Sequence, residues 1–357
     1  MTATAPPPDG LTDVPGIRVG HARVAGPRAL SGTTVVLAPE GGAVAAVDVR
    51  GGGPGTRETD ALDPRNVVQR IDALVLTGGS AYGLDAAAGV MAWLEERHRG
   101  VRVGPDPAHV VPVVPAACVF DLGRGGDFAA RPDAATGRAA VAAAAASGDH
   151  ARVATGAVGA GTGAVVGGLR GGVGTASARL ESGITVGALV VVNAVGSALD
   201  PATGVLYGSL FEDGGPPVRP SAAVREAAAV RLAEARAASV RPPLNTTLAV
   251  VATDAVLTRA QAQKVAGTAH DGIARAIRPV HLMNDGDTVF ALATGARELP
   301  AAPGPLALNE VLAAGADLVT RAIVRAVLAA PGGLRGPGGD FPSYRELYDP
   351  AHDPYSR

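Results

Sequence analysis

The sequence has few aromatic residues, a single cysteine and no excess of charge of either sign. Aromatic side chains make up 3% of the 357 residues, and Cys118 is the only cysteine. No intrachain disulfide can therefore form. The formal net charge of -2 offers no basic field to nucleic acid or to an anionic membrane surface, so neither partner is expected.

Long hydrophobic runs and targeting signals are also missing. The longest apolar stretch, Val186–Val195, is too short to span a bilayer and contains Asn193. The N-terminus, MTATAPPPDG, has neither the basic nor the apolar region of a secretory signal. No pair of histidines has a zinc-like spacing, and neither a metal nor an organic cofactor is expected. These absences predict a soluble, cytoplasmic protein.

The residues that are abundant are small and aliphatic. Hydrophobic residues make up 47% of the chain, which also has 49 glycines. A core of Ala, Val, Leu and Gly must bring backbones close together, because large anchoring side chains are scarce. The chain is long enough for one large domain or two modest ones. Residues 1–10, rich in Pro and Thr, are predicted to be a disordered lead.

Strand-like and helix-like segments are mixed without strict alternation, which predicts the α/β or α+β class with layered sheets and helices. Ile184–Val195, β-branched and nearly uncharged, is the candidate for a buried central strand. The other predicted strands are Thr33–Leu37, Ala43–Val49, Ala73–Thr77, Thr246–Thr253 and Thr288–Thr294. The predicted helices are Ser80–Arg97 capped by Ser80, Ala139–Ser147, Val224–Ser239, one from the Thr258–Gln261 capping box to Ile277, and one from the cap Asn309 to Ala330. Tyr344 and Tyr348 are expected to dock the C-terminal tail.

Asn245 and Thr246 are the first candidates for chemistry. Thr246 heads a predicted strand and follows a Pro-containing linker, Val240–Asn245. If the preceding peptide bond were broken, Thr246 would carry both a hydroxyl and a free α-amine. Such an amine has a reference pKa of about 8 and can act as the base for the hydroxyl of its own residue. The simpler interpretation is an ordinary β-forming threonine at the start of a strand, and the residues alone leave both open.

Three further patterns have a structural and a chemical interpretation. The run Asn284–Asp287 is either a turn or a pair of carboxylates that tunes a nearby nucleophile. Asn193 interrupts an apolar strand, so its amide either bonds to neighbouring backbone or stabilises an oxyanion. The glycine-rich loops near 51–55, 78–83 and 159–163 lack a complete phosphate-binding or dinucleotide-binding pattern. Tight backbone packing around a site explains these loops better than cofactor binding.

Several long segments, in order, resemble one family over nearly the whole chain. This family contains the L-aminopeptidase/D-amidase–esterases, the β-peptidyl aminopeptidases and the 6-aminohexanoate-oligomer (nylon-oligomer) hydrolases. The matching runs are Leu11–His21, Asp48–Thr59, Leu76–Asp85, Gly171–Ser177, Val192–Gly196, Asn245–Leu248 and Asp285–Phe290. The Asn before Thr246 is most similar to the nylon-oligomer hydrolase branch, since the peptidase members usually cut before Ser.

The resemblance implies a fold, a processing event and roles for four residues. The fold would be an αββα sandwich similar to that of N-terminal-nucleophile hydrolases, with different connectivity. The precursor would be cut into an α-chain, 1–245, and a β-chain, 246–357, which form one intertwined domain. Thr246 would be the nucleophile and Asn193 the oxyanion-hole residue. Asp285 and Asp287 would support cleavage and proton handling.

Two positions depart from the family pattern. Arg170 stands where the family commonly has Lys; it keeps the positive charge but cannot serve as a neutral base. The tyrosine that gives relatives a second oxyanion donor has no secure counterpart, and Phe128 occupies the approximate region. Arg170 and Tyr82 are kept as candidates for substrate binding.

These patterns together predict a self-processed hydrolase that acts on small peptides, amino-acid amides or aminohexanoate oligomers. Its processed αβ units are expected to associate, as a homotetramer by family analogy. Two other functions stay open: an acyltransferase of the ornithine/glutamate acetyltransferase type, whose Ala-Thr-Met-Leu nucleophile context is absent here, and an uncleaved scaffold or binding protein. Dinucleotide binding through the glycine loops is a third and weaker interpretation.

Overall fold

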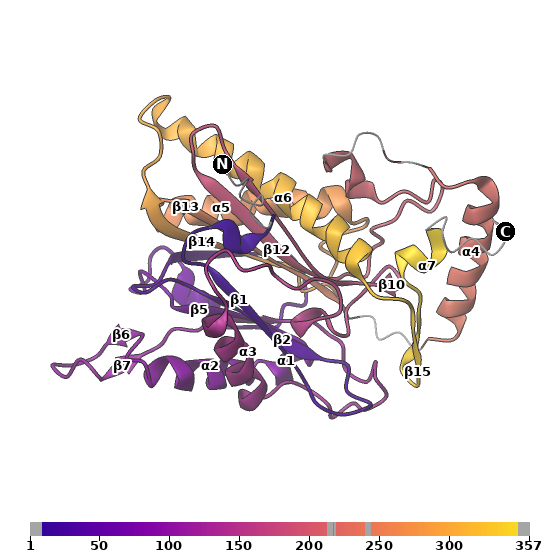
Figure 1. Cartoon of the computed structure of the whole chain (residues 1–357), viewed down its shortest axis with the longest axis horizontal. Coiled ribbons are helices and arrows are strands. Elements are labelled where there is room, and N and C mark those ends of the chain that lie inside the picture. The colour runs from indigo at the N-terminus through magenta and orange to yellow at the C-terminus, as the bar shows by residue number, and fades with distance from the viewer. Residues whose placement is uncertain (1–8, 213–216, 218, 240–243, 349–357) are drawn as a thin grey trace, which may run out of the picture.

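The computed structural model describes residues 9–212, 217, 219–239 and 244–348. The predicted lead, 1–10, and the predicted linker, Val240–Asn245, lie mostly outside these ranges. Two five-stranded sheets pack face to face, and helices cover the outer face of each sheet (Figure 1). The predicted four-layer αββα sandwich is therefore confirmed.

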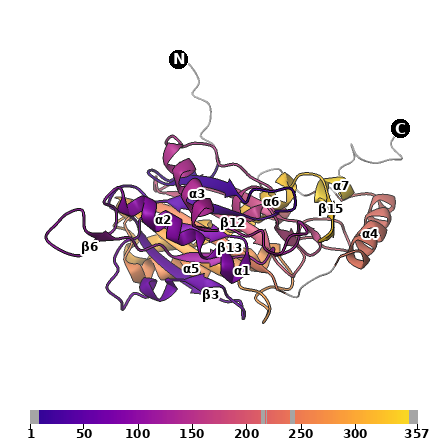
Figure 2. The ribbon, with the colours of Figure 1, turned by 90° about the horizontal axis from the view of Figure 1, so that it is seen from below.

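The first sheet has the strand order β1-β2-β5-β8-β4. The strands are β1 Arg18–Arg23, β2 Gly32–Leu37, β5 Ala73–Thr77, β8 Ala116–Cys118 and β4 Thr56–Arg57. Neighbouring strands are antiparallel except for the parallel pair β5 and β8. Helices α2 (Ala86–Glu95) and α3 (Ala134–Ala146) cover the outer face of this sheet, and Figure 2 shows them in front of it.

The second sheet has the order β11-β12-β13-β14-β3. Its strands are β11 Gly172–Arg179, β12 Thr185–Asn193, β13 Thr246–Ala255, β14 Thr288–Arg297 and β3 Val44–Val49. Helices α5 (Arg259–Ala276) and α6 (Leu308–Ala329) cover its outer face. The predicted central strand, Ile184–Val195, is the interior strand β12, whereas the centre of the sheet is β13.

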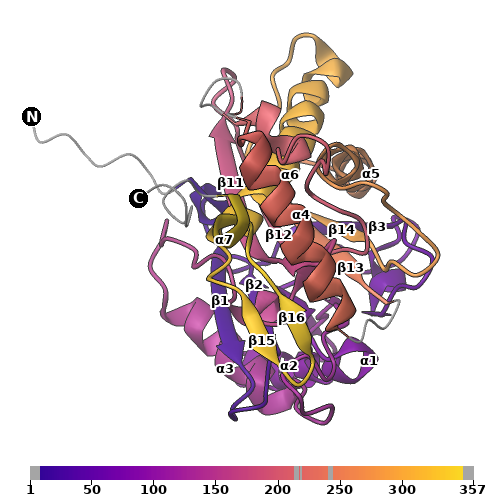
Figure 3. The same cartoon turned by 90° about the vertical axis from the view of Figure 1, so that its right-hand side faces the viewer.

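Shorter elements complete the described part of the chain. They are α1 Ser80–Gly83, α4 Ala222–Ala237, α7 Tyr344–Tyr348, β6 Val101–Arg102, β7 Val110–Val111, β9 Val165–Val166, β10 Leu169–Arg170, β15 Leu334–Gly336, β16 Gly339–Phe341 and 3₁₀ turns at Leu11–Asp13, Thr59–Leu62, Gly159–Gly161, Tyr207–Phe211 and Gly304–Ala307. The C-terminal elements α7 and β16 pack beside α4 (Figure 3). Tyr344 stacks on Tyr348 and donates to the Gly204 carbonyl at 2.9 Å, so the predicted docking of the tail is confirmed.

Within the described ranges, no helix has both the length and the apolar character needed to cross a membrane.

Two predicted helix caps are wrong. Ser80 does not cap one long helix; the segment divides into α1 and α2, and Gly79, in the left-handed region at φ 78°, precedes α1. The reason is local, since the Gly79 N–H donates to the buried Asp121 carboxylate at 2.7 Å and this bond sets the turn. Asn309 lies inside α6, because the 3₁₀ turn Gly304–Ala307 runs directly into the helix without a capping side chain.

Both outer helix layers approach the sheets at a glycine. An ideal Cβ on Gly20 of β1 would lie 2.2 Å from the Ala140 carbonyl oxygen of α3. An ideal Cβ on Gly174 of β11 would lie 1.9 Å from the Ala322 carbonyl oxygen of α6. Backbone therefore packs on backbone at equivalent places in the two sheets, as expected for a core with few large side chains.

Replacing Gly174 should destabilise the fold. In Gly174→Ala the new methyl group meets helix backbone, which cannot move aside as a side chain can, so the free energy of unfolding should fall by about 1–3 kcal/mol. Urea denaturation followed by circular dichroism measures the loss. Gly104→Ala is the matched control, since a Cβ there has no heavy atom within 4 Å. Equal stability of the two variants would contradict the packing argument.

Candidate active site

Three chain segments meet at one edge of the second sheet. Thr246, the first residue of β13, lies opposite Asn193, the last residue of β12. Strand β14 runs parallel to β13 and is preceded by the 284–287 turn, so that Asp285 forms a parallel bridge with Asn245. Thr246 is 4% exposed and Asn193 is fully buried. The residues predicted to act together are thus brought together.

The carbonyl oxygen of the Asn245–Thr246 peptide bond accepts two hydrogen bonds. The Thr246 hydroxyl donates to the Asn245 carbonyl oxygen at 2.6 Å. The Gly286 N–H donates to the same oxygen at 3.0 Å. Of these two donors, the Gly286 N–H can favour negative charge on this oxygen, as an oxyanion-hole donor does. The nucleophile predicted from the sequence therefore lies beside the bond it would cut.

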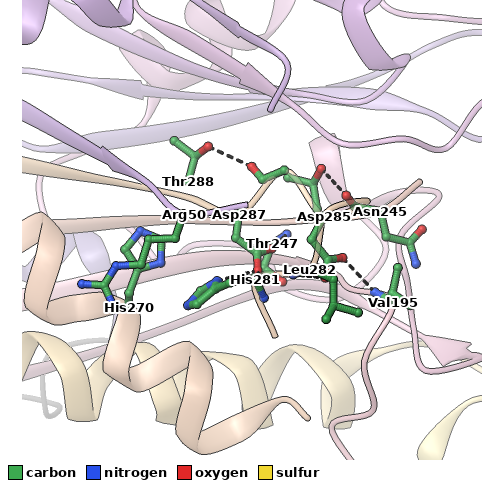
Figure 4. A network of polar contacts seen from close by, with 12 residues as sticks. Arg50, Val195, Asn245, Thr247, His270, His281, Leu282, Asp285, Asp287 and Thr288 are labelled. Atoms are coloured by element: carbon green, nitrogen blue, oxygen red, sulfur yellow. Dashed lines mark hydrogen bonds and ion pairs between the residues drawn. The ribbon is translucent and has the colours of Figure 1, made fainter. Parts of the chain in front are cut away.

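Both carboxylates of the turn accept backbone N–H groups (Figure 4). Asp287 is fully buried and accepts from the Thr247 N–H at 2.7 Å, which fixes the start of β13. Asp285 accepts from the N–H groups of Val195 and Leu282, each at 3.3 Å. Burial, followed by the charge of Asp287, raises the pKa of Asp285, so this carboxyl keeps its proton to a higher pH than an exposed aspartate.

Two histidines extend this network away from Thr246. Both the backbone N–H and the ring Nδ1 of His281 bond to the second carboxylate oxygen of Asp287, at 3.1 and 2.8 Å. His281 has φ 58°, a left-handed conformation that lets backbone and ring reach the same oxygen. His270 packs edge-on against His281 with 4.8 Å between ring centroids, and burial lowers its pKa to about 4. His270 is therefore uncharged at neutral pH and adds no buried charge to this network.

Asn193 has a fixed amide orientation because two donors point at its Oδ1. They are the Val165 N–H at 3.0 Å and the Arg124 guanidinium. The Asn193 amide nitrogen donates to the Phe120 carbonyl at 3.3 Å. One of the two amide hydrogens is engaged by that bond, and the second is the one that could serve an oxyanion.

Arg124 links the two asparagines of the site. Its guanidinium donates to the Asn245 Oδ1 at 2.9 Å, to Asn193 as above, and to the Gly163 carbonyl at 2.6 Å. The side chain is 8% exposed and comes from the loop after β8. Sequence reasoning missed it, because an arginine in a glycine-rich loop is usually a surface residue and nothing in the pattern marks it as buried.

The glycine-rich run after β3 packs against the 282–287 turn. The Gly52 N–H donates to the Leu282 carbonyl at 3.0 Å, and the Gly53 N–H donates to the Asp285 carbonyl at 2.8 Å. An ideal Cβ on Gly51 would lie 2.3 Å from the Asp287 nitrogen. For this loop, tight backbone packing around the site is confirmed.

The weaker sequence candidates lie at the margin of this cluster. Arg170 is buried and donates to the Thr162 carbonyl at 3.2 Å, next to the Gly163 carbonyl that Arg124 binds. Burial, with the nearby Arg23 charge, lowers the pKa of Arg170. Tyr82 is 56% exposed beneath the Arg131 guanidinium, and Phe128 is also exposed. A substrate-binding role for Arg170 or Tyr82 stays a prediction.

Comparison with known proteins agrees with this architecture. The profile of peptidase family S58 matches residues 9–338. The chain belongs to this family. It is therefore a hydrolase of peptide or amide bonds, and membership favours that function over the acetyltransferase and scaffold alternatives. An uncharacterized aminopeptidase of Mycobacterium bovis is 49% identical, and the alignment covers 95% of this chain and 98% of that protein.

More distant relatives of the S58 protein share its fold. A 6-aminohexanoate-oligomer endohydrolase of a Kocuria species is 33% identical, over 82% of this chain and 77% of that protein. The structure of a Burkholderia β-aminopeptidase superposes with a TM-score of 0.69 at 26% identity, covering 95% of this chain and 92% of that one. The L-aminopeptidase D-Ala-esterase/amidase of Ochrobactrum anthropi, described as a variant of the Ntn hydrolase fold, superposes with a TM-score of 0.70 at 22% identity and covers 96% and 93% of the two chains.

A methyl group at Gly286 should disturb the site without disturbing the fold elsewhere. An ideal Cβ there would lie 2.6 Å from the Thr246 Oγ1 and 2.9 Å from the Gly53 carbonyl oxygen. Gly286→Ala should therefore slow cleavage of the Asn245–Thr246 bond by roughly tenfold or more, since misplacing reacting groups by about 1 Å costs rate steeply. Gly53→Ala is the control, because its Cβ meets atoms only at 3.4 Å or beyond. Intact mass against time measures both, and equal rates would contradict the prediction.

Asp121 should give stability an unusual pH dependence. Burial raises the pKa of this carboxyl from 3.8 to about 6, although the Gly79 N–H and the Arg124 charge oppose the shift. The folded state then holds the proton more tightly than the unfolded state. Stability falls as pH rises from about 4 to about 6, by about 3 kcal/mol for this group. Asp121→Asn should remove that decline.

Urea denaturation at pH 4 and pH 7 measures the difference. The wild type should lose more stability over this interval than Asp121→Asn does. Glu181→Gln, at an exposed carboxyl, should behave like the wild type. An identical pH dependence in wild type and Asp121→Asn would refute the assignment.

Proposed function

We propose that the protein is an N-terminal-nucleophile aminopeptidase/amidase that exposes Thr246 by cutting its own chain after Asn245. The observation that carries this proposal is the Thr246 hydroxyl, 2.6 Å from the carbonyl oxygen of the preceding peptide bond, with the Gly286 N–H at 3.0 Å on the same oxygen. The hydroxyl lies next to this carbonyl group, and the Gly286 N–H can stabilise the negative charge that forms on its oxygen when the hydroxyl attacks the carbon.

Self-cleavage proceeds through an ester. The Thr246 oxygen attacks the carbonyl carbon of Asn245, the C–O bond forms, the C–N bond breaks, and the hydroxyl proton passes to the departing nitrogen. Water then hydrolyses the ester; its oxygen remains in the new Asn245 carboxylate, and a proton returns to the Thr246 oxygen. The products are an α-chain, 1–245, and a β-chain, 246–357, that begins with a free amine.

Substrate hydrolysis repeats this chemistry between molecules. The Thr246 amine takes the hydroxyl proton as the oxygen attacks the substrate carbonyl, and the leaving amine departs with a proton. Water releases the acyl group from the enzyme. Asn193 stabilises the oxyanion through its second amide hydrogen, while Asp285 and Asp287 orient the amine and hydroxyl of Thr246.

The substrates of this proposal are short peptides, amino-acid amides and aminohexanoate oligomers. The Burkholderia relative is a β-aminopeptidase and the Kocuria relative is a 6-aminohexanoate-oligomer endohydrolase, which supports this range. No step calls for a metal, and the described residues contain no group of three or more His, Cys, Asp or Glu side chains suited to one.

The sheet supports the view that both products stay in one intertwined domain. Strands β13 and β14 of the β-chain lie between β12 and β3 of the α-chain. Without the β-chain, the second sheet lacks the strands β13 and β14. Without the α-chain, it lacks the strands β11, β12 and β3 that flank them. By family analogy, we expect the processed αβ units to form a homotetramer.

Replacing the nucleophile tests the proposal. The wild type should give two chains of roughly 24 and 11 kDa, from scaling the 35.2 kDa mass by length, and the two should copurify. Thr246→Ala should stay full-length and inactive, because it lacks the attacking oxygen. Thr246→Ser keeps a hydroxyl and should still be cut. Denaturing intact mass and amide hydrolysis measure both properties, and a full-length wild type that hydrolyses amides would sink the mechanism.

A further inference from the structure

His281 makes two hydrogen bonds to one oxygen of the Asp287 carboxylate. Its backbone nitrogen lies 3.1 Å and its ring Nδ1 lies 2.8 Å from Asp287 Oδ2. The other oxygen, Oδ1, accepts from the Thr247 N–H at 2.7 Å. Because a carboxylate only accepts hydrogen bonds, Nδ1 is the ring nitrogen that carries a hydrogen. One residue thus fixes one end of the carboxylate, while the other end faces the start of β13 (Figure 4).

The bond between Asp287 and Thr247 lies close to Thr246. On the side of β14, the pairing of β13 begins at Leu248, opposite Thr288. The bond from the Thr247 N–H to Asp287 reaches one residue nearer to Thr246 than this pairing does. That N–H belongs to the planar peptide group that joins residues 246 and 247, so holding it fixes the carbonyl end of Thr246.

His281 reaches the start of β13 from the helix-covered side of the sheet. Leu248 belongs to the core between the two sheets, whereas Ala249 packs under the outer helices. Because side chains alternate along a strand, the Thr246 hydroxyl points with Leu248 toward the first sheet. His281 packs instead against His270 of α5. Its ring can therefore act on Thr246 through the backbone, and it is not placed to take the hydroxyl proton.

The hydrogen bond to Asp287 is the polar contribution of the His281 ring. The other ring nitrogen, Nε2, is buried and has no hydrogen-bond partner among the described residues. A buried polar atom without a partner costs stability, so an apolar side chain would pack here at less cost. What the ring adds at this position is the second donor to the carboxylate oxygen.

From this geometry we propose that His281 is a positioning residue for Thr246: by fixing the Asp287 carboxylate, it holds the peptide group after Thr246 and keeps the attacking oxygen beside its target carbonyl. The inference rests on the proposed function and adds a residue to the four whose roles the family resemblance implies. His281 transfers no proton, and it serves self-cleavage and substrate hydrolysis alike because the same oxygen attacks in both.

Asn and Asp at position 281 make a matched pair. Both tolerate the left-handed conformation of His281 (φ 58°) and have nearly the same shape. Asn offers an N–H at about the place of Nδ1, whereas Asp offers only acceptors. His281→Asn should therefore be cut within about threefold of the wild-type rate, and His281→Asp more slowly by roughly tenfold or more, the usual effect of a hydrogen bond to a charged group.

Intact mass against time, from synthesis of each chain in a cell-free translation, gives these rates. Equal rates in His281→Asn and His281→Asp would overturn the role of the ring donor and leave the proposed function standing. A folded wild type that stays full-length would sink the proposed function as well.

His281→Gly allows the ring to be supplied from solution. Glycine also adopts the left-handed conformation freely. The His281 side chain is 18% exposed, so the space that it leaves opens to solvent. This variant should be cut roughly tenfold more slowly than the wild type, and added imidazole should restore part of the rate while leaving the wild type unchanged.

Two results with His281→Gly would contradict the proposal. One is cleavage at the wild-type rate without imidazole. The other is a slow rate that a folded His281→Asn shares, because the shape of the ring and not its donor would then be responsible. Circular dichroism establishes that each variant is folded, and the comparison of Asn with Asp does not depend on the glycine variant.

Steady-state hydrolysis of L-alanine p-nitroanilide provides a third measurement, with kcat counted per processed chain. Since His281 acts through the backbone of β13, His281→Gly should lower kcat by roughly tenfold and leave KM within about twofold of the wild type. A changed KM with an unchanged kcat would refute a positioning role. A processed wild type that hydrolyses no amino-acid amide would contradict the proposed substrates, and the self-cleavage rates would still test His281.

Discussion

The hydrogen-bond register of three strands determines where Thr246, Asn193 and the two aspartates lie. Strand β12 is antiparallel to β13, and β14 is parallel to it. The end of β12 and the starts of the other two must therefore meet at one sheet edge. A shift of one residue would turn Thr246 to the opposite face. Strand β13 is buried along its whole length, which makes such a shift costly.

Backbone contacts hold this edge more than side chains do. The glycine run after β3 gives its N–H groups to the 282–287 turn, and Gly286 lies against the Thr246 hydroxyl. The helices meet the sheets in the same way, through Gly20 and Gly174. A chain with 49 glycines and 3% aromatics thus gains rigidity from close backbone approach, which loose side-chain packing would not provide.

The sequence predicted the layers and the residues that meet at the end of the second sheet, and it did so by two different routes. β-Branched runs located the interior strands, and ordered motifs connected Thr246 with Asn193 and the two aspartates. The caps at Ser80 and Asn309 were wrong because each depends on a neighbouring turn rather than on its own side chain. Arg124 could not be found, since its burial is created by a loop that folds onto the site from a distant part of the chain. His281 could not be found because its bonds to Asp287 depend on a left-handed backbone conformation that the sequence pattern does not predict.

The interleaved order β12-β13-β14-β3 affects how the protein can fold before and after cleavage. Before cleavage, folding is an intramolecular event whose rate does not depend on concentration. If the chain is cut as proposed, the central strands belong to a separate polypeptide, and refolding after denaturation becomes a second-order meeting of two partners. The peptide link between the two chains would then be needed only for the first folding, when it brings β13 and β14 between strands of the other chain. The separated chains of the processed enzyme could not easily refold together.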